Sequence, residues 1–93
     1  MIKEFRDKHT EALFDLEACH RKWRSFEPVA LRKLNMVHAA KELKDLRSPP
    51  GNRLEPLVGD RLGQYSIRIN DQYRVCFVWN DGDAYEVEIT DYH

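Results

Sequence analysis

The residues with the clearest chemical potential lie in the second half of the chain and at its end. Residues 47–79 carry five basic side chains, and all five are arginine: Arg47, Arg53, Arg61, Arg68 and Arg74. A guanidinium can bind phosphate oxygens with two parallel hydrogen bonds, which a lysine ammonium cannot do. The last three residues, Asp91, Tyr92 and His93, supply a carboxylate, a ring that can stack and a side chain that titrates near neutral pH. These are the residue types that RNA cleavage without a metal ion uses.

In that reaction a base removes the proton from a ribose 2′-OH, and the oxygen attacks the adjacent phosphorus. An acid then protonates the departing 5′-oxygen, while a cation stabilises the extra negative charge on the phosphate. A plainer interpretation also fits the sequence. In it the arginines form ordinary surface ion pairs, Tyr92 caps the core and His93 lies in solvent, as side chains at a chain end usually do. Residue types alone leave both interpretations open.

The charge is distributed unevenly along the 93 residues, although the net charge is only −1. Residues 1–46 carry ten basic and eight acidic side chains, and residues 47–79 carry five basic and three acidic ones. Residues 80–93 carry five acidic side chains and no lysine or arginine. Strong binding to free nucleic acid usually needs a basic surface, so the net charge of −1 argues against such binding. A local arginine surface is nevertheless predicted.

Several classes of enzyme lack their motifs here. The sequence holds no phosphate-binding G-x-x-x-x-G-K-[ST], no G-x-G-x-x-G, no H-E-x-x-H and no G-x-S-x-G. Nucleotide hydrolysis, dinucleotide chemistry, zinc proteolysis and serine esterase chemistry are therefore not supported. The two cysteines, Cys19 and Cys76, are far apart and not in a C-x-x-C motif, so we interpret both as small apolar residues. No metal or other cofactor is expected.

The length and hydropathy predict a single domain over residues 1–93. No apolar run approaches the roughly 18–20 residues of a membrane span, and the first residues lack the apolar region of a signal peptide. We therefore expect a cytoplasmic protein with no membrane partner.

The first half of the chain predicts helices. Residues 2–5 are a candidate for a short strand, and Thr10 is placed to cap a helix that runs through Cys19. The basic residues 20–25 surround Trp23 and predict a solvated connection, in which the ring packs or stacks.

A longer helix is predicted next, over residues 29–46, with Pro28 in its first turn and His38 facing solvent. The sequence Ser-Pro-Pro-Gly-Asn at residues 48–52 must end it.

The second half predicts an antiparallel meander of three strands. Residues 64–70 and 72–79 alternate, with apolar side chains on one face and Arg68 and Arg74 on the other. An Asp-Gly pair predicts a hairpin at residues 80–83, before a last strand that buries Tyr85, Val87 and Ile89 and exposes Glu86 and Glu88. The predicted fold is α+β: a twisted antiparallel sheet with two helices on one face and arginines on the other.

The order and spacing of four segments resemble the HigB branch of the RelE toxin superfamily. They are RLEPLVGDR at 53–61, GQYSIRIN at 63–70, QYRVCF at 72–77 and EITDYH at 88–93. The start MIKEF matches as well, and DLRSPPGNRLE at 45–55 is especially similar to the GraT-type members. The resemblance covers nearly the whole chain.

The resemblance implies a bacterial type II toxin with a RelE-like fold, a ribosome-dependent endoribonuclease that cuts translated mRNA in the decoding site of the 70S ribosome. It implies metal-independent cleavage to a 2′,3′-cyclic phosphate and a 5′-hydroxyl. It also implies a HigA-like antitoxin with a helix-turn-helix fold, through which alone the toxin would reach operator DNA.

By position, Arg74 falls on the family's phosphate-stabilising arginine, and residues 91–93 fall on its C-terminal Asp-Tyr-His. We expect His93 to carry the proton, Asp91 to orient it or act as base, and Tyr92 to pack or stack on a base. Four further residues are expected on RNA or phosphate: Arg53, Arg61, Arg68 and Tyr65.

One position departs from the pattern. Some HigB proteins carry a catalytic histidine where this chain has Glu55, and a carboxylate is a weaker base than imidazole at neutral pH. Glu55 is still a candidate catalytic residue, but the substitution is compatible with a slower toxin. The competing hypothesis is a non-catalytic homologue that acts by binding the antitoxin or the ribosome.

Overall fold

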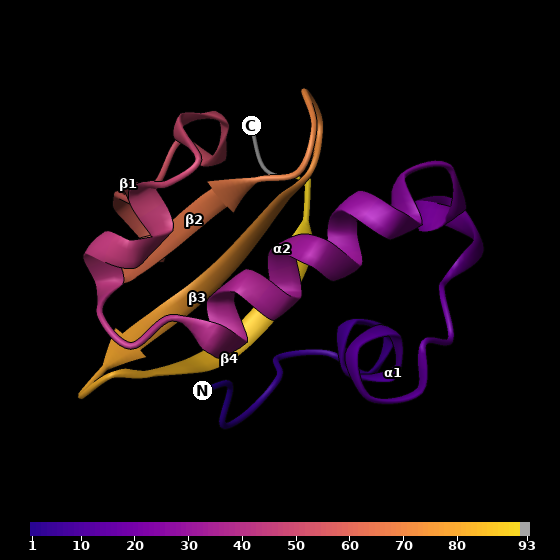
Figure 1. The fold of residues 1–93 in the computed structure, drawn as a ribbon, viewed down its shortest axis with the longest axis horizontal. Helices are drawn as coiled ribbons and strands as arrows, with labels where there is room; N and C mark the ends of the chain where they lie inside the picture. The colour runs from indigo at the N-terminus through magenta and orange to yellow at the C-terminus, as the bar shows by residue number, and fades with distance from the viewer. Residues whose placement is uncertain (92–93) are drawn as a thin grey trace.

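The computed structural model describes residues 1–91 and builds them around one antiparallel sheet, with strand order β1-β2-β3-β4 (Figure 1). The strands span Glu55–Pro56 (β1), Gln64–Arg68 (β2), Arg74–Asn80 (β3) and Asp83–Thr90 (β4). Helices α1 (Lys8–Leu16) and α2 (Glu27–Ala39) cover one face. Four 3₁₀ helices connect these elements, at Arg21–Phe26, Leu43–Arg47, Pro50–Asn52 and Gly59–Arg61. None of the helices described is long and apolar enough to span a bilayer.

The core lies between the sheet and the helices. Apolar side chains at alternate positions of β2 and β3 meet the apolar stripe of α2. The fully buried members include Ile67, Val75, Phe77, Leu34 and Val37. The α+β prediction is therefore correct, but its fourth strand was misplaced. Ile2 and Phe5 form only isolated parallel bridges to β4, and residues 55–56 supply the edge strand instead.

The predicted hairpin is confirmed, but the strand that follows it contains a bulge. Asp81 and Gly82 both adopt positive φ, at 53° and 83°, as a two-residue turn of this kind requires. The register then shifts opposite Cys76–Val78, where Glu86 has φ 51°. Because a shift of one residue exchanges the faces of a strand, Tyr85 pairs with Val78 on the arginine-bearing face. The prediction that Tyr85 belongs to the core was wrong, and the buried Ala84 takes that place.

The first helix is shorter than predicted and is capped differently. Asp7 is the N-cap, and its carboxylate accepts from the Thr10 amide at 3.2 Å. The helix ends at Leu16 because Glu17 turns into the left-handed region at φ 52°. Thr10 is buried inside the helix instead of capping it, and its hydroxyl accepts from the Ile89 amide at 3.0 Å.

The second helix also ends early. Pro28 lies in its first turn as predicted, but the helix stops at Ala39. The Asp45 carboxylate accepts from the amides of Lys41 and Glu42, at 3.1 and 3.0 Å, and starts a separate 3₁₀ turn. This break brings Leu46 into the core, where it is 1% exposed.

The connection around Trp23 and the side chain of His38 were both expected to be solvated, but both are packed. The basic connection forms the ordered 3₁₀ helix Arg21–Phe26, and Trp23 is buried within it. His38 is half-buried, since its Nδ1 accepts from the Ile2 amide at 3.1 Å and its ring lies 5.1 Å from that of Phe14.

Candidate active site

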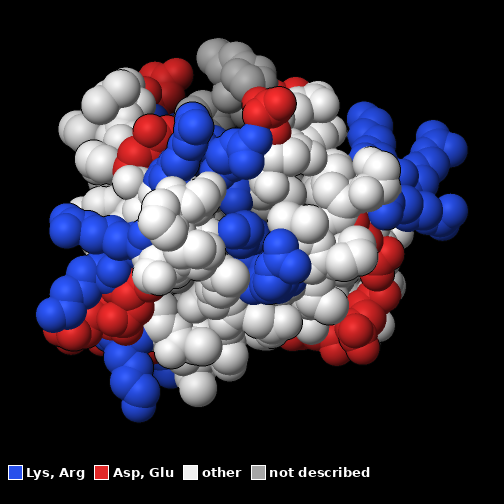
Figure 2. All heavy atoms as spheres, turned by 45° about the horizontal axis from the view of Figure 1, so that its top comes forward, with Lys and Arg blue, Asp and Glu red and all other residues white. Residues whose placement is uncertain are grey.

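A pocket of about 340 Å³ lies where β1, β2 and the start of β3 meet. Its lining includes four of the residues predicted from the sequence: Arg53, Glu55, Arg68 and Arg74. Figure 2, in which the top of Figure 1 is turned toward the viewer, shows Lys and Arg side chains gathered near its upper centre, with a few acidic ones at the margin. The lining therefore holds three guanidinium groups and two carboxylates, those of Glu55 and Asp71.

The two strand arginines are direct neighbours. Antiparallel pairing places Arg68 opposite Arg74, with both side chains on the face away from the helices. Like charges at such a pair disfavour the sheet unless other groups offset them. Asp71 forms an ion pair with Arg68, but Asp71 is fully exposed, so solvent weakens this pair. An anion in the pocket would stabilise both arginines.

Arg74 is held in a fixed orientation. Its Nε donates to the buried Ser66 Oγ at 2.7 Å, and one terminal nitrogen donates to the Arg53 carbonyl at 2.7 Å. The same nitrogen lies 3.7 Å from a carboxylate oxygen of Glu55, and the Arg74 side chain is only 16% exposed. A guanidinium whose position is set before the substrate arrives is suited to stabilise charge that develops on a phosphate.

The Arg53 carbonyl depends on a buried polar pair beneath the pocket. Asn52 is fully buried, and its Oδ1 accepts a hydrogen bond from the ammonium of Lys33 on α2. Its amide nitrogen donates to the carbonyls of Leu46 and Ser48, at 3.2 and 3.3 Å. These bonds fix the loop immediately before Arg53. Burial, together with the charges of Arg32 and Arg68, lowers the pKa of Lys33.

Arg61 lies in the adjacent hollow, which it lines together with Glu55 and Pro56. Its guanidinium donates to Glu88 at 3.0 Å and to Gln64 at 3.1 Å. A phosphate reaching Arg61 would therefore have to compete with the Glu88 carboxylate.

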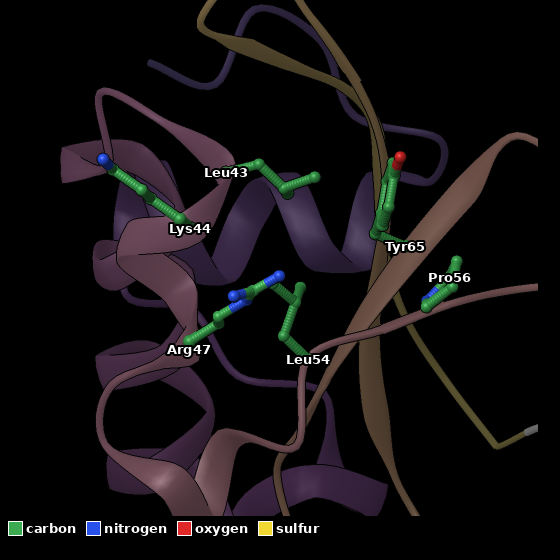
Figure 3. A pocket seen from close by; sticks show the side chains of 6 residues that line it. All are labelled: Leu43, Lys44, Arg47, Leu54, Pro56 and Tyr65. Atoms are coloured by element: carbon green, nitrogen blue, oxygen red, sulfur yellow. The ribbon is translucent and has the colours of Figure 1, made fainter.

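Tyr65 is not brought to this pocket. It alternates with Ser66 along β2 and so points to the opposite face of the sheet, into a hollow lined by Leu43, Arg47 and Leu54 among others (Figure 3). Its ring centroid lies 6.4 Å from that of Phe77.

Asp91 reaches the pocket through a side chain that sequence reasoning missed. Gln72 lines the pocket, and its amide nitrogen donates to an Asp91 carboxylate oxygen at 2.9 Å. Tyr92 and His93 lie outside the described residues. Ser66 was also missed, although its position two residues before Arg68 on the same face could have identified it.

The cysteines behave as small apolar residues, as predicted: Cys19 is half-buried, Cys76 is fully buried, and both are free thiols. Burial raises the pKa of the Cys76 thiol to about 11. Within residues 1–91 there is no cluster of three or more His, Cys, Asp and Glu side chains that could hold a metal ion.

The raised pKa of Cys76 predicts how stability depends on pH. Between pH 9 and 11 the thiol ionises in the unfolded chain but stays protonated in the folded one, so the free energy of unfolding falls as pH rises. The expected contribution is about 2–3 kcal/mol. In urea denaturation at pH 9, 10 and 11, the free energy of unfolding should fall more steeply with pH for the wild type than for Cys76→Ala. Equal pH dependence in the two proteins would contradict the raised pKa of Cys76.

Comparison with known proteins gives consistent matches. Residues 3–93 match a family model described as the RelE-like toxin of the type II toxin-antitoxin system HigB. Toxin HigB-1 of Vibrio cholerae is 46% identical over 85 residues, which cover 90% of each chain. Endoribonuclease HigB of Proteus vulgaris is 31% identical over 93 residues, the full length of both.

The fold also resembles that of a solved structure. A crystal structure of a YafQ mutant from E. coli superposes with a TM-score of 0.60 at 10% identity, over 98% of this chain and 91% of that one. The predicted RelE-like α+β fold is thus confirmed.

Proposed function

Because this chain belongs to the HigB family of RelE-like toxins from type II toxin–antitoxin systems, we propose that it is an endoribonuclease that cuts mRNA on the translating ribosome. The observation that carries the proposal is the fixed guanidinium of Arg74 in a pocket shared with Arg53 and Arg68. The relative from Proteus vulgaris, which is named an endoribonuclease, supports the same reaction class.

In the proposed reaction the 2′-oxygen of one ribose loses its proton and attacks the adjacent phosphorus. The bond from phosphorus to the 5′-oxygen breaks, and that oxygen takes up a proton. The products are a 2′,3′-cyclic phosphate and a 5′-hydroxyl. Guanidinium groups meet the charge that develops on the phosphate, so the proposed route needs no metal ion.

We assign the residues as follows. Arg74 stabilises the phosphate, and Arg53 and Arg68 help to bind it, since all three line one pocket. His93 transfers the proton, and Tyr92 stacks on a base. Asp91, which Gln72 holds at the pocket, orients His93 or accepts a proton in its place.

We propose the 70S ribosome as the site of action because the chain has a net charge of −1, which offers little general attraction for free RNA. Contacts with ribosomal RNA would supply the missing affinity and orientation. We further propose neutralisation by a HigA-like helix-turn-helix antitoxin, in keeping with a family defined by toxin–antitoxin pairs.

One contact favours a second candidate function. Glu55 lies 3.7 Å from the Arg74 guanidinium, where its carboxylate competes with a phosphate for the same cation. A weakly active or non-catalytic toxin that acts by binding the antitoxin or the ribosome would tolerate this arrangement.

Induction of the wild type in bacteria, followed by mapping of mRNA 5′ ends, distinguishes the two functions. We expect slower growth and new 5′ ends in phase with codons, and we expect both to disappear in His93→Ala. The matched control is His9→Ala, because His9 is exposed on α1 and outside the pocket. Phased cuts that persist in His93→Ala would assign proton transfer to another residue. Slow growth without new ends would favour the non-catalytic toxin.

A further inference from the structure

A second hollow, of about 440 Å³, lies on the other side of the edge strand β1 from the arginine pocket. Tyr65 and Leu54 form part of its wall, and Arg47 extends toward them from the opposite wall (Figure 3). Hollows of this size accept a small ring system, whereas a helix, about 10 Å across with its side chains, needs a longer groove.

The walls combine a flat ring, apolar side chains and the guanidinium of Arg47. Tyr65 is half-buried and packs against Phe77, which limits the motion of its ring. No carboxylate is among the residues that line the hollow. Within the part of the chain that the structure describes, Arg47 has no acidic group within 4 Å, while Lys44 pairs with Glu42 at 3.5 Å. An aromatic face near a guanidinium is a typical surface for stacking an unpaired nucleobase.

Three hollows follow one another around β1, and each shares one lining residue with the next. Glu55 lines both the arginine pocket and the hollow of Arg61, and Pro56 lines both the hollow of Arg61 and that of Tyr65. A linear chain laid across this edge would therefore meet Arg74, then Arg61, then Arg47. A cation at each step suits a polymer that carries a phosphate at every unit.

We propose that this hollow binds a nucleobase of the RNA strand, flanking the linkage that the arginine pocket cleaves. Tyr65 stacks on the base, and Arg47 contacts the base face or the neighbouring phosphate. The inference rests on the proposed function and deepens it, because it assigns part of the substrate specificity to a site outside the pocket.

The edge itself argues against a bound peptide strand. An extended peptide gains affinity by hydrogen bonding along an edge strand, but β1 has only two residues. One of these is Pro56, which has no amide hydrogen to donate. An RNA base needs no such backbone partners.

The first test measures cleavage of mRNA on purified ribosomes. Tyr65→Leu removes the ring, so KM should rise about 5- to 150-fold, the range for loss of one stacked base. The rate constant kcat should change less than threefold, and the pattern of cleaved positions should broaden. Tyr65→Phe keeps the ring and should retain the wild-type KM. Circular dichroism and thermal unfolding of both variants establish that they fold.

The second test does not depend on cleavage. The four nucleoside 5′-monophosphates are titrated into the full chain carrying Arg74→Lys, and the amide NMR signals of Tyr65 and Leu54 are followed. We expect shifts at both positions that are lost in Tyr65→Leu and weakened in Arg47→Gln.

The two tests separate the possible failures. If monophosphates bind in the hollow but the wild-type protein does not cleave mRNA, the proposed function is refuted and the base site is still supported. Cleavage by the wild type with no NMR shifts and an unchanged KM for Tyr65→Leu would overturn the base site. It would also be overturned if Tyr65→Leu weakened only the binding of the antitoxin, since the hollow would then belong to a protein partner.

Discussion

Replacing Arg74 by lysine should lower the rate constant of RNA cleavage about 100- to 1,000-fold, the usual effect of removing one fixed donor to a developing oxyanion. The wild-type guanidinium donates to the Ser66 hydroxyl and the Arg53 carbonyl, so its position is set before RNA binds. A lysine ammonium is a point charge on a flexible stem and cannot make these contacts and also face a phosphate. Single-turnover cleavage of mRNA on ribosomes measures the effect.

Arg21→Lys provides the matched control. Arg21 is exposed on the 3₁₀ helix Arg21–Phe26, away from the residues that line the pocket, and its replacement should change the rate less than twofold. Thermal unfolding of Arg74→Lys should show that the fold is kept. Wild-type cleavage by Arg74→Lys would mean that another group stabilises the phosphate.

Replacing Asn52 by leucine should destabilise the protein by about 3 kcal/mol, because it leaves the buried ammonium of Lys33 without its acceptor. The two backbone carbonyls that Asn52 now satisfies would also lose their donor. Urea denaturation measures the loss. For a domain of this size, that is a large share of the free energy of unfolding.

The double variant Lys33→Met/Asn52→Leu distinguishes the cost of an unpaired buried charge from the cost of changed packing at position 52. Because it removes both polar partners, it should recover more than half of the stability lost in Asn52→Leu. A double variant less stable than Asn52→Leu would show that the Lys33 ammonium has another essential partner. Both variants should also cleave RNA more slowly than the wild type, since Asn52 fixes the loop that presents the Arg53 carbonyl to Arg74.

The pocket keeps a local positive charge in a protein that is nearly neutral. Acidic side chains contact several of the arginines, as Glu55 does Arg74, Glu88 does Arg61 and Asp71 does Arg68. These pairs reduce the electrostatic cost of gathering like charges in the absence of RNA. In the proposed function the same pairs would have to loosen for a phosphate to bind.

The sequence alone was sufficient for the fold class, the meander and the arginine-bearing face. Alternation along residues 64–70 and 72–79 assigns each side chain to a face, and an Asp-Gly turn allows few connections. The position of Arg74 beside Arg68 follows from that local pattern, and the order of the motifs was sufficient to identify the family.

Only the tertiary structure decided where the local patterns are interrupted. The bulge at Glu86 moves Tyr85 to the other face, and the second helix ends at Ala39, seven residues before the predicted point, where the carboxylate of Asp45 starts a separate turn. The orientation of Arg74 depends on Ser66, on Arg53 and, through Asn52, on Lys33 of a distant helix. Such contacts join residues far apart in the chain, and their energies depend on burial and distance, which no local spacing records.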